Sequence, residues 1–262
     1  MPTLIITLTT DFGTRDPFVG VMKGVVLQIA PAVHLVDLTH EISPHDVLEG
    51  ALALEAAVGF FPLGTVHLAV VDPGVGSARR PLAVAAAGQQ FVGPDNGLFS
   101  FLFSGEAWSA VLLENPAYRL PRVSETFHGR DVFAPAAAHL AVGIPLHRLG
   151  PPVTDPVVIP WPTAHRKGDR LVGEVVHVDR FGNLVTSLRT TDLRALGPPS
   201  ALVVEVEDKE VGRIVGCYAD LPPGGSGALI GSSGRLEVSV REGSALAVTG
   251  ARRGSTVRVR KQ

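Results

Sequence analysis

Cysteine is nearly absent from this sequence, because Cys217 is the only one among 262 residues. A single thiol excludes an intramolecular disulfide and any metal cluster built from cysteine alone. Such scarcity is typical of proteins in a reducing compartment. We therefore expect a cytoplasmic protein.

An excess of charge of either sign is also missing. The chain carries 23 Lys and Arg against 25 Asp and Glu, a formal net charge of −2. Proteins that bind nucleic acids or anionic membranes through electrostatics usually carry a broad basic surface. The sequence therefore predicts neither partner and favours a small, discrete ligand.

Long apolar runs are lacking as well. No charge-free stretch reaches the ~20 residues that a membrane helix needs. The start, MPTLIITLTTDFG, has no basic segment or cleavage site, and Asp11 interrupts its apolar run, so we expect no signal segment. Hydrophobic residues nevertheless make up 45% of the chain, enough for a globular protein with a sizeable core.

Three buried strand patterns, at residues 4–10, 33–38 and 65–72, alternate with helical patterns in the first part of the chain. This β-α-β-α-β order predicts parallel strands whose carboxyl ends share one edge of a sheet. Asp11 and Asp72 both fall at that edge, outside which ligands of open α/β sheets bind. Alternatively, either acid could merely cap a turn.

Both intervening helices carry start signals. The first is expected over residues 17–30, with Asp16 as N-cap and Pro17 in first position. The second is expected to begin with Ser43 as cap and Asp46 in the capping-box position.

The pattern changes in the last third. Residues 1–152 are predicted to form an α/β domain with a mostly parallel sheet, and residues 153–169 a proline-rich linker. Residues 170–262 hold short apolar runs, among them ALAVTG at 245–250, between glycine-rich turns. They predict a small antiparallel β-barrel or sandwich.

The stretch VVDPGVGSARR, residues 70–80, resembles a phosphate-binding loop. A dinucleotide fingerprint needs a helix after its glycines, and a P-loop needs G-K-[ST]; the stretch has neither. There remains a sharp glycine turn that could fold Arg79 or Arg80 back toward Asp72. The alternative is a surface ion pair, worth only about 0–1 kcal/mol.

A second candidate is His128 in TFHGRDVFAP, at an expected helix start. Its imidazole could orient water or a leaving group near neutral pH. Most of the nine histidines must be structural or solvated, however. Nor does any H-x-x-x-H or H-E-x-x-H pattern support His128 as a metal ligand, so no metal is expected.

A third candidate is DRFGN, which follows a predicted strand. Asp179 could receive an ammonium group, Phe181 could stack on a base, and Asn183 offers both a donor and an acceptor. The alternative is a β-turn with Gly182 at positive φ.

Five motifs follow one another along the chain: TDFGTRDPFVG (10–20), VVDPGVGSARR (70–80), GPDNG (93–97), FHGRDVFAP (127–135) and DRFGN (179–183). Together they resemble the S-adenosyl-L-methionine hydroxide adenosyltransferases, relatives of the fluorinases and chlorinases that use the same substrate. The resemblance runs nearly from end to end.

The resemblance implies an N-terminal α/β domain and a C-terminal β-barrel. It also implies a homotrimer, with each active site between one subunit's N-domain and its neighbour's C-domain. The implied reaction converts S-adenosyl-L-methionine and water into adenosine and L-methionine without a cofactor. The family's water-holding Asp, Arg and His fall on Asp72, Arg79 and His128, with Arg80 as an alternative to Arg79.

The family's ligand contacts fall on Asp11 (ribose diol), Asp16 (methionine portion), Asp179 (methionine ammonium), Phe181 and Asn183 (adenine), and Ser233 (methionine carboxylate). At the position of Ser233 the halogenases tend to carry an arginine, so this chain departs from them there.

The nearest rival function is a halogenase that takes chloride or fluoride in place of water. Fluorinases carry a serine where Gly129 stands and lack an acid at the position of Asp72, and a carboxylate should repel a halide. Water is therefore favoured. Two further alternatives are a non-catalytic module that senses adenosine or S-adenosyl-L-methionine, and a metal-dependent hydrolase with Asp11, Asp72 and His128 as ligands.

Overall fold

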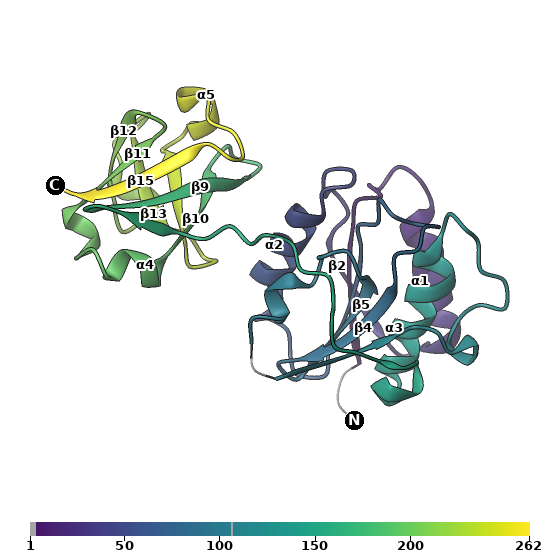
Figure 1. Ribbon diagram of the computed structural model, residues 1–262. Coiled ribbons are helices and arrows are strands. Elements are labelled where there is room, and N and C mark those ends of the chain that lie inside the picture. The colour runs from purple at the N-terminus through teal and green to yellow at the C-terminus, as the bar shows by residue number, and fades with distance from the viewer. Residues whose placement is uncertain (1–3, 106) are drawn as a thin grey trace. The chain divides into compact units, whose positions relative to one another are not determined.

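The computed structural model describes residues 4–105 and 107–262. The chain divides into two compact units, the first ending at Pro160 and the second beginning at Trp161. Each has its own sheet and its own hydrophobic core (Figure 1). Within the described part of the chain, no helix is long and apolar enough to cross a bilayer.

Seven strands form the sheet of the first unit, in the order β2-β1-β3-β5-β4-β6-β7. Their bounds are β1 Ile5–Thr10, β2 His34–Thr39, β3 Val66–Val70, β4 Pro81–Ala86, β5 Gln89–Pro94, β6 Trp108–Leu112 and β7 Pro152–Val153. The pairs β1 with β2, β1 with β3 and β3 with β5 are parallel, and the other three are antiparallel. The prediction of a mostly parallel sheet is confirmed in part: β2, β1, β3 and β5 are parallel, and the rest of the sheet is antiparallel, because β4 and β5 form a hairpin that reverses the chain.

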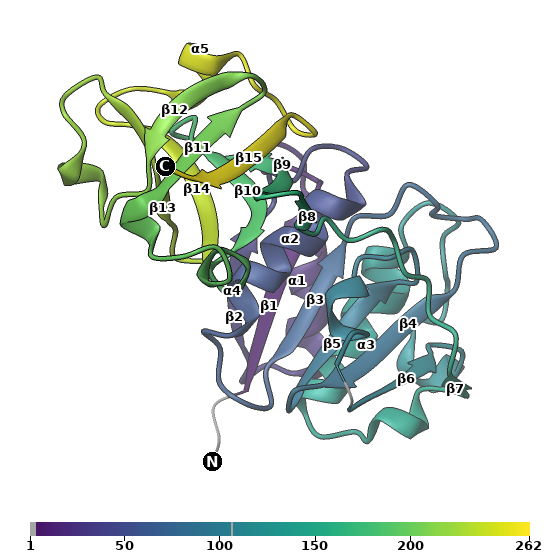
Figure 2. The same ribbon diagram turned by 60° about the vertical axis from the view of Figure 1, so that its left-hand side comes forward.

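Three α-helices cover this sheet: α1 Phe18–Ile29, α2 Val47–Val58 and α3 Ala134–Ala141. The step from β1 to β2 and the step from β2 to β3 run in opposite directions across the sheet. Right-handed crossovers therefore place α1 and α2 on opposite faces. Figures 1 and 2 show α1 and α3 together on one face and α2 on the other.

The predicted starts of both helices are wrong by one to a few residues. The N-cap of α1 is Pro17 rather than Asp16. The N-cap of α2 is Asp46, whose side chain accepts a hydrogen bond from the N3 amide at 2.9 Å, rather than Ser43. The reason is His45, whose φ of 68° is incompatible with a helix and delays the start until the next residue.

The parallel register brings the two predicted acids to one edge. Thr10, the last residue of β1, lies opposite Val70, the last residue of β3. Asp11 follows Thr10 directly, and Asp72 comes two residues after Val70. The shared edge expected from the β-α-β-α-β pattern is confirmed.

The second unit contains one antiparallel sheet in the order β12-β11-β15-β9-β10-β14-β13, with β8 beside β9. The bounds are β8 His165–Lys167, β9 Arg170–Val178, β10 Leu184–Arg189, β11 Leu202–Val206, β12 Lys209–Arg213, β13 Ser226–Ile230, β14 Arg235–Val240 and β15 Thr256–Lys261. The end strands approach each other, because Ile214 bridges Ala228 and the Ser226 hydroxyl donates to the Val211 carbonyl at 2.8 Å. The sheet is thus nearly closed and barrel-like.

Two short helices complete the second unit, α4 Thr190–Arg194 and α5 Ala245–Thr249. Helix α5 occupies ALAVTG, which the sequence pattern presents as one more strand-like run, so that expectation is wrong. The Ser244 hydroxyl accepts the amide of Ala247 at 3.2 Å, and Gly250 ends the helix at φ 70°. These N-terminal and C-terminal caps favour a helix over a strand in this segment.

The proline-rich stretch between the two sheets has little regular structure. Residues 154–164 carry no helix or strand, and β8 follows as a short strand paired with β9. The predicted linker of residues 153–169 therefore overlaps both units.

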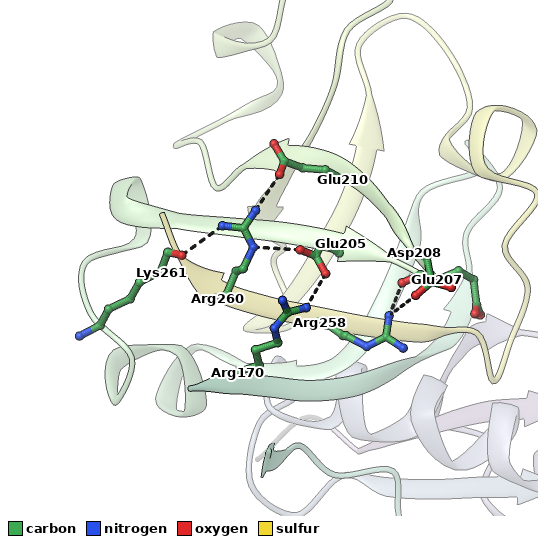
Figure 3. Close-up of polar contacts among 8 residues, drawn as sticks. All are labelled: Arg170, Glu205, Glu207, Asp208, Glu210, Arg258, Arg260 and Lys261. Carbon is green, nitrogen blue, oxygen red and sulfur yellow. Dashed lines mark hydrogen bonds and ion pairs between the residues drawn. The ribbon is translucent and has the colours of Figure 1, made fainter. Parts of the chain in front are cut away.

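An ion-pair network crosses one face of the barrel, over β9, β15, β11 and β12 (Figure 3). Arg260 contacts Glu205 and Glu210, each at 2.9 Å, and Arg170 contacts the other oxygen of Glu205 at 3.1 Å. Opposite charges on neighbouring strands support the pairing of those strands.

Candidate active site

Asp72 and Arg79 form a buried ion pair at the carboxyl edge of the first sheet. The Arg79 Nε donates to Asp72 Oδ1 at 2.8 Å, and Nη2 donates to Oδ2, so the contact is bidentate. The Arg79 side chain is only 8% exposed and the Asp72 side chain only 4%. Bidentate pairs shielded from water are far stronger than surface ion pairs, so the alternative of a surface pair is excluded.

The loop between the two residues is two consecutive turns. The amide of Val75 donates to the Asp72 carbonyl at 3.2 Å, and the amide of Ser77 donates to the Gly74 carbonyl at 3.1 Å. Gly76 has φ 76°, and a Cβ on it would lie 2.5 Å from the Glu125 carbonyl oxygen. Only glycine therefore allows this loop to approach the segment that leads to His128.

His128 contacts the same guanidinium. The Arg79 Nη2 lies 2.8 Å from His128 Nδ1. Arginine can only donate, so Nδ1 is the acceptor, and the proton of the neutral imidazole sits on Nε2. The pKa of His128 lies below its usual 6.5, mainly because the ring is buried and next because the charge of Arg79 opposes protonation. His128 is therefore neutral at pH 7.

The backbone after His128 is unusual. Residues Gly129–Phe133 form one π-helical turn that leads into α3. Such turns are frequent at functional sites. This turn places the Phe133 ring 5.0 Å from the centre of the Arg79 guanidinium. The Arg79 guanidinium therefore makes a cation–π contact with the Phe133 ring.

Arg79 retains one unused donor. Its Nη1 is buried and has no hydrogen-bond partner among the residues that the structure describes. Buried donors are almost always satisfied by protein, water or ligand. The guanidinium can therefore bind one more oxygen atom on its side away from Asp72, because Nε and Nη2 form the edge that faces the carboxylate.

Arg80 is held elsewhere. Its Nε donates to Asp95 at 2.7 Å, and its other nitrogens donate to the side chain and carbonyl of Asp155 at 2.9 and 2.7 Å. The structure thus separates the two adjacent arginines, and Arg79 is the one that joins Asp72 and His128.

Asp11 accepts the amide of His45 at 2.9 Å, while Asp16 is exposed in the same loop. The loop is tied to β2 through His40, a buried histidine that the motifs did not single out. The His40 carbonyl accepts the amide of Gly13 at 2.7 Å, and its Nδ1 lies 2.9 Å from the Thr10 hydroxyl. The contacts of His40 with Thr10 and Gly13 follow from the pairing of β1 with β2 and could not be read from a short motif.

Three phenylalanines join the Asp11 loop to the His128 segment. Phe12, Phe18 and Phe127 contact one another edge to face, with centroids 5.4 to 6.0 Å apart. The first unit therefore gathers Asp11, Asp72, Arg79 and His128 at one edge. Among the described residues, Asp16 has no hydrogen bond or ion pair.

The second unit has an open pocket of about 960 Å³, lined in part by Asp179, Phe181 and Asn183. The Asp179 carboxylate accepts three hydrogen bonds: from the amides of Phe181 and Asn183 at 2.9 and 2.8 Å, and from the Asn183 side chain at 2.8 Å. Phe181 is 76% exposed and Asn183 is buried. The segment therefore both lines the pocket and forms the β-turn that was the alternative interpretation, with Gly182 at φ 81°.

Tyr218 and Glu237 are among the pocket residues that escaped the motif analysis. They lie 19 residues apart in sequence, yet their side chains are joined by a hydrogen bond of 3.0 Å. Ser232 lines the pocket, whereas Ser233 is not among its lining residues. No short motif contains both Tyr218 and Glu237, so only the folded sheet reveals the pair.

No group of three or more His, Cys, Asp and Glu within residues 4–105 and 107–262 is placed to hold a metal ion. Asp72, one ligand of the metal-dependent alternative, already pairs with Arg79 through both oxygens.

Known families and proteins match nearly the whole chain. The model of the SAM hydroxide adenosyltransferase N-terminal domain matches residues 6–150, and that of the C-terminal domain matches residues 173–258. The chain is 44% identical to the (R)-S-adenosyl-L-methionine hydrolase of Thermus thermophilus, over 95% of this chain and 97% of that protein. It is 32% identical to a fluorinase of Actinoplanes sp. strain N902-109, over 74% of each.

A solved structure is similar as well. The crystal structure of an uncharacterized conserved protein from Thermotoga maritima has a TM-score of 0.93 at 33% identity, over 98% of this chain and 100% of that one. The fold is therefore shared across the whole length.

Proposed function

Since this chain belongs to the SAM hydroxide adenosyltransferase family and is a hydrolase of S-adenosyl-L-methionine, we propose that water attacks the ribose 5′ carbon and releases adenosine and L-methionine. The observation that carries the proposal is the contact of one buried guanidinium with both Asp72 and His128. We assign these two residues, together with Arg79, to the attacking water.

The reaction depends mainly on how the attacking water is positioned. The sulfonium of the substrate is already a good leaving group, so the reaction needs a nucleophile held in line at about 3–3.5 Å from the 5′ carbon. The Asp72 carboxylate supplies an acceptor for a hydrogen of the water, and the Arg79 guanidinium fixes that carboxylate through Nε and Nη2. Both groups are held rigidly, because each is fixed by the other.

The proton of the water must also leave. Bulk water has a pKa of about 15.7, so a base must accept the proton as the bond to carbon forms. His128 is neutral at pH 7, because burial and the charge of Arg79 lower its pKa. Asp72 carries the negative charge that favours the loss of the proton. Asp72 can accept it through a lone pair that Arg79 leaves free, whereas His128 can accept it only after its Nδ1 gives up the contact with Arg79. A halide in the same place would meet the repulsion of the Asp72 carboxylate.

The substrate contacts are proposals of the same kind. We assign Asp11 to the ribose diol, Asp16 to the methionine portion and Ser233 to the methionine carboxylate. In the second unit, Asp179 receives the methionine ammonium, and the exposed ring of Phe181 and the buried amide of Asn183 contact the adenine. The concave pocket that contains the last three residues supports this part.

We further propose a homotrimer whose active sites lie between the first unit of one subunit and the second unit of its neighbour. Mixing two inactive variants, Asp72→Asn and Asn183→Ala, would then restore part of the activity, because some shared sites would contain two intact halves. Sedimentation of the wild type at trimer mass is the expected companion result. A monomer at working concentration would contradict this proposal.

The reaction is tested by incubation with S-adenosyl-L-methionine in ¹⁸O water. We expect the label in the 5′ hydroxyl of adenosine and an equal amount of L-methionine. Formation of 5′-halo-5′-deoxyadenosine with added chloride or fluoride would instead favour the halogenase. Tight binding without product over hours would favour a sensing module.

The role of the guanidinium is tested by a matched pair of variants. Arg79→Lys keeps the charge but loses the bidentate contact, so we expect kcat to fall by at least ~100-fold. Arg80→Lys changes the adjacent residue in the same way, and activity should stay near that of the wild type. Equal losses in both variants would refute the assignment.

We propose that no cofactor or metal takes part and that the protein acts in the cytoplasm. Full activity after dialysis against a chelator is the expected result for the first point. Loss of activity that one divalent cation restores would contradict it.

A further inference from the structure

Besides Asp179, the pocket of the second unit is lined by two acids that no motif includes, Glu237 and Glu242. Glu242 is exposed and pairs with the neighbouring Arg241 at 3.6 Å, whereas Glu237 is buried. Glu237 lies on β14, all six residues of which are buried, and is itself 9% exposed. Its backbone belongs to the rigid barrel wall rather than to a loop. Its carboxylate is thus held at a fixed position in the pocket lining.

The Glu237 carboxylate has few partners. Its Oε2 accepts a hydrogen bond from the Tyr218 hydroxyl at 3.0 Å. Within the part of the chain that the structure describes, no Lys, Arg or His forms an ion pair with Glu237. A buried carboxylate without a cation is costly, and such groups are normally paired.

The barrel makes room for this carboxylate. A Cβ on Gly231 would lie 1.8 Å from Glu237 Oε1, so no other residue type fits beside the acid in this position. Gly231 also lines the pocket. The glycine thus leaves space for Oε1 at the pocket wall.

A neighbouring acid shares the pocket. Burial is the main cause that raises the pKa of Glu237, and the charge of Asp179 raises it further, whereas the hydrogen bond from Tyr218 lowers it. The two carboxylates are therefore close enough to repel each other. A cation between them would relieve both the repulsion and the burial penalty.

We propose that Glu237 receives the ammonium group of the methionine portion of the substrate, together with Asp179. This inference rests on the proposed function. Of the cationic groups in the substrate, only the ammonium carries N–H donors, and its three donors can serve more than one carboxylate. The sulfonium has no such donor, and the adenine amino group is neutral. Asp179 already accepts three hydrogen bonds within its own turn, so Glu237 is the less occupied acceptor.

The experiment measures the affinity of the full-length protein for L-methionine, for adenosine and for 4-(methylsulfanyl)butanoate, the methionine analogue without the amino group, by calorimetry. Glu237→Gln keeps the shape and the contact with Tyr218 but removes the charge. We expect affinity for L-methionine to fall at least ~10-fold, as for a lost charge-assisted hydrogen bond. Affinity for adenosine and for the analogue should not change.

Two controls keep the result specific. Glu210→Gln changes an exposed acid of the ion-pair network in Figure 3, and all three affinities should remain at wild-type values. Gly231→Ala should displace the Glu237 carboxylate and weaken L-methionine binding selectively, which provides a second variant if Glu237→Gln does not fold.

An equal loss for L-methionine and for the deaminated analogue would overturn the inference, as would unchanged L-methionine affinity in Glu237→Gln. Failure of the proposed function is distinguishable, because the wild type would then form no labelled adenosine in ¹⁸O water whatever the variants bind.

Discussion

The buried histidine in the centre of β3 makes the first unit sensitive to acid. His67 is fully buried, stacked on Phe91 at 4.9 Å, and its Nδ1 lies 2.8 Å from the Thr7 hydroxyl. Burial lowers the pKa of His67 from 6.5 to about 4, against a smaller opposing effect of a hydrogen bond with Gln89. The ring is therefore neutral in the folded protein down to about pH 4.

The sign and size of the effect follow from proton linkage. Above pH 6.5 the ring is neutral in both the folded and the unfolded chain, and stability is complete. As the pH falls from 6.5 toward 4, the unfolded chain binds a proton that the folded protein does not, so stability is lost. At roughly 1.4 kcal/mol for each pH unit, the loss by pH 4 amounts to about 3 kcal/mol.

The matched perturbation is the double variant Thr7→Val/His67→Phe. It replaces both partners of a buried hydrogen bond with apolar groups of similar shape, which can be nearly neutral for stability. The aromatic contact with Phe91 is retained. At pH 7 we expect a free energy of unfolding close to that of the wild type.

The assay is urea unfolding followed by circular dichroism at several pH values from 7 to 4, at one protein concentration. Carboxylates contribute to acid loss in both proteins, so the difference between them isolates His67. The wild type should lose about 3 kcal/mol more than the variant over this range. Parallel stability curves for the two proteins would refute the reasoning.

Three further predictions concern the loop, the site and the surface. Gly76→Ala should lower the free energy of unfolding by at least about 1–2 kcal/mol and reduce kcat, because it strains the turn and forces the Cβ against the Glu125 carbonyl; urea unfolding and steady-state kinetics check this. Because burial and Arg79 lower the pKa of His128, kcat/KM should fall with acid only below pH 6.5; an acid limb centred above that value would contradict a neutral His128 in the working site. Arg260→Gln should lower Tm at low salt, with a difference that shrinks at high salt, because exposed ion pairs are screened.

Local patterns were sufficient for much of the first unit. Buried strands, helical periodicity and the glycine turn are properties of short segments, so the strand at Val66–Val70 and the shared edge of Asp11 and Asp72 could be predicted. The complete mixed sheet could not, because the β4–β5 hairpin is a local pairing, whereas the positions of β6 and β7 depend on strands that are distant in sequence. The predicted start of α2 failed for a related reason. His45 has a positive φ, and its amide donates a hydrogen bond to Asp11, which is distant in sequence.

The sequence by itself determined the family and the reaction class, because these reside in five short motifs. Only the tertiary structure decided between Arg79 and Arg80. The two side chains contact segments that are distant in sequence: Arg79 contacts His128, and Arg80 contacts Asp95 and Asp155. The contact of Glu237 with Tyr218 likewise exists only after the barrel has closed around its pocket.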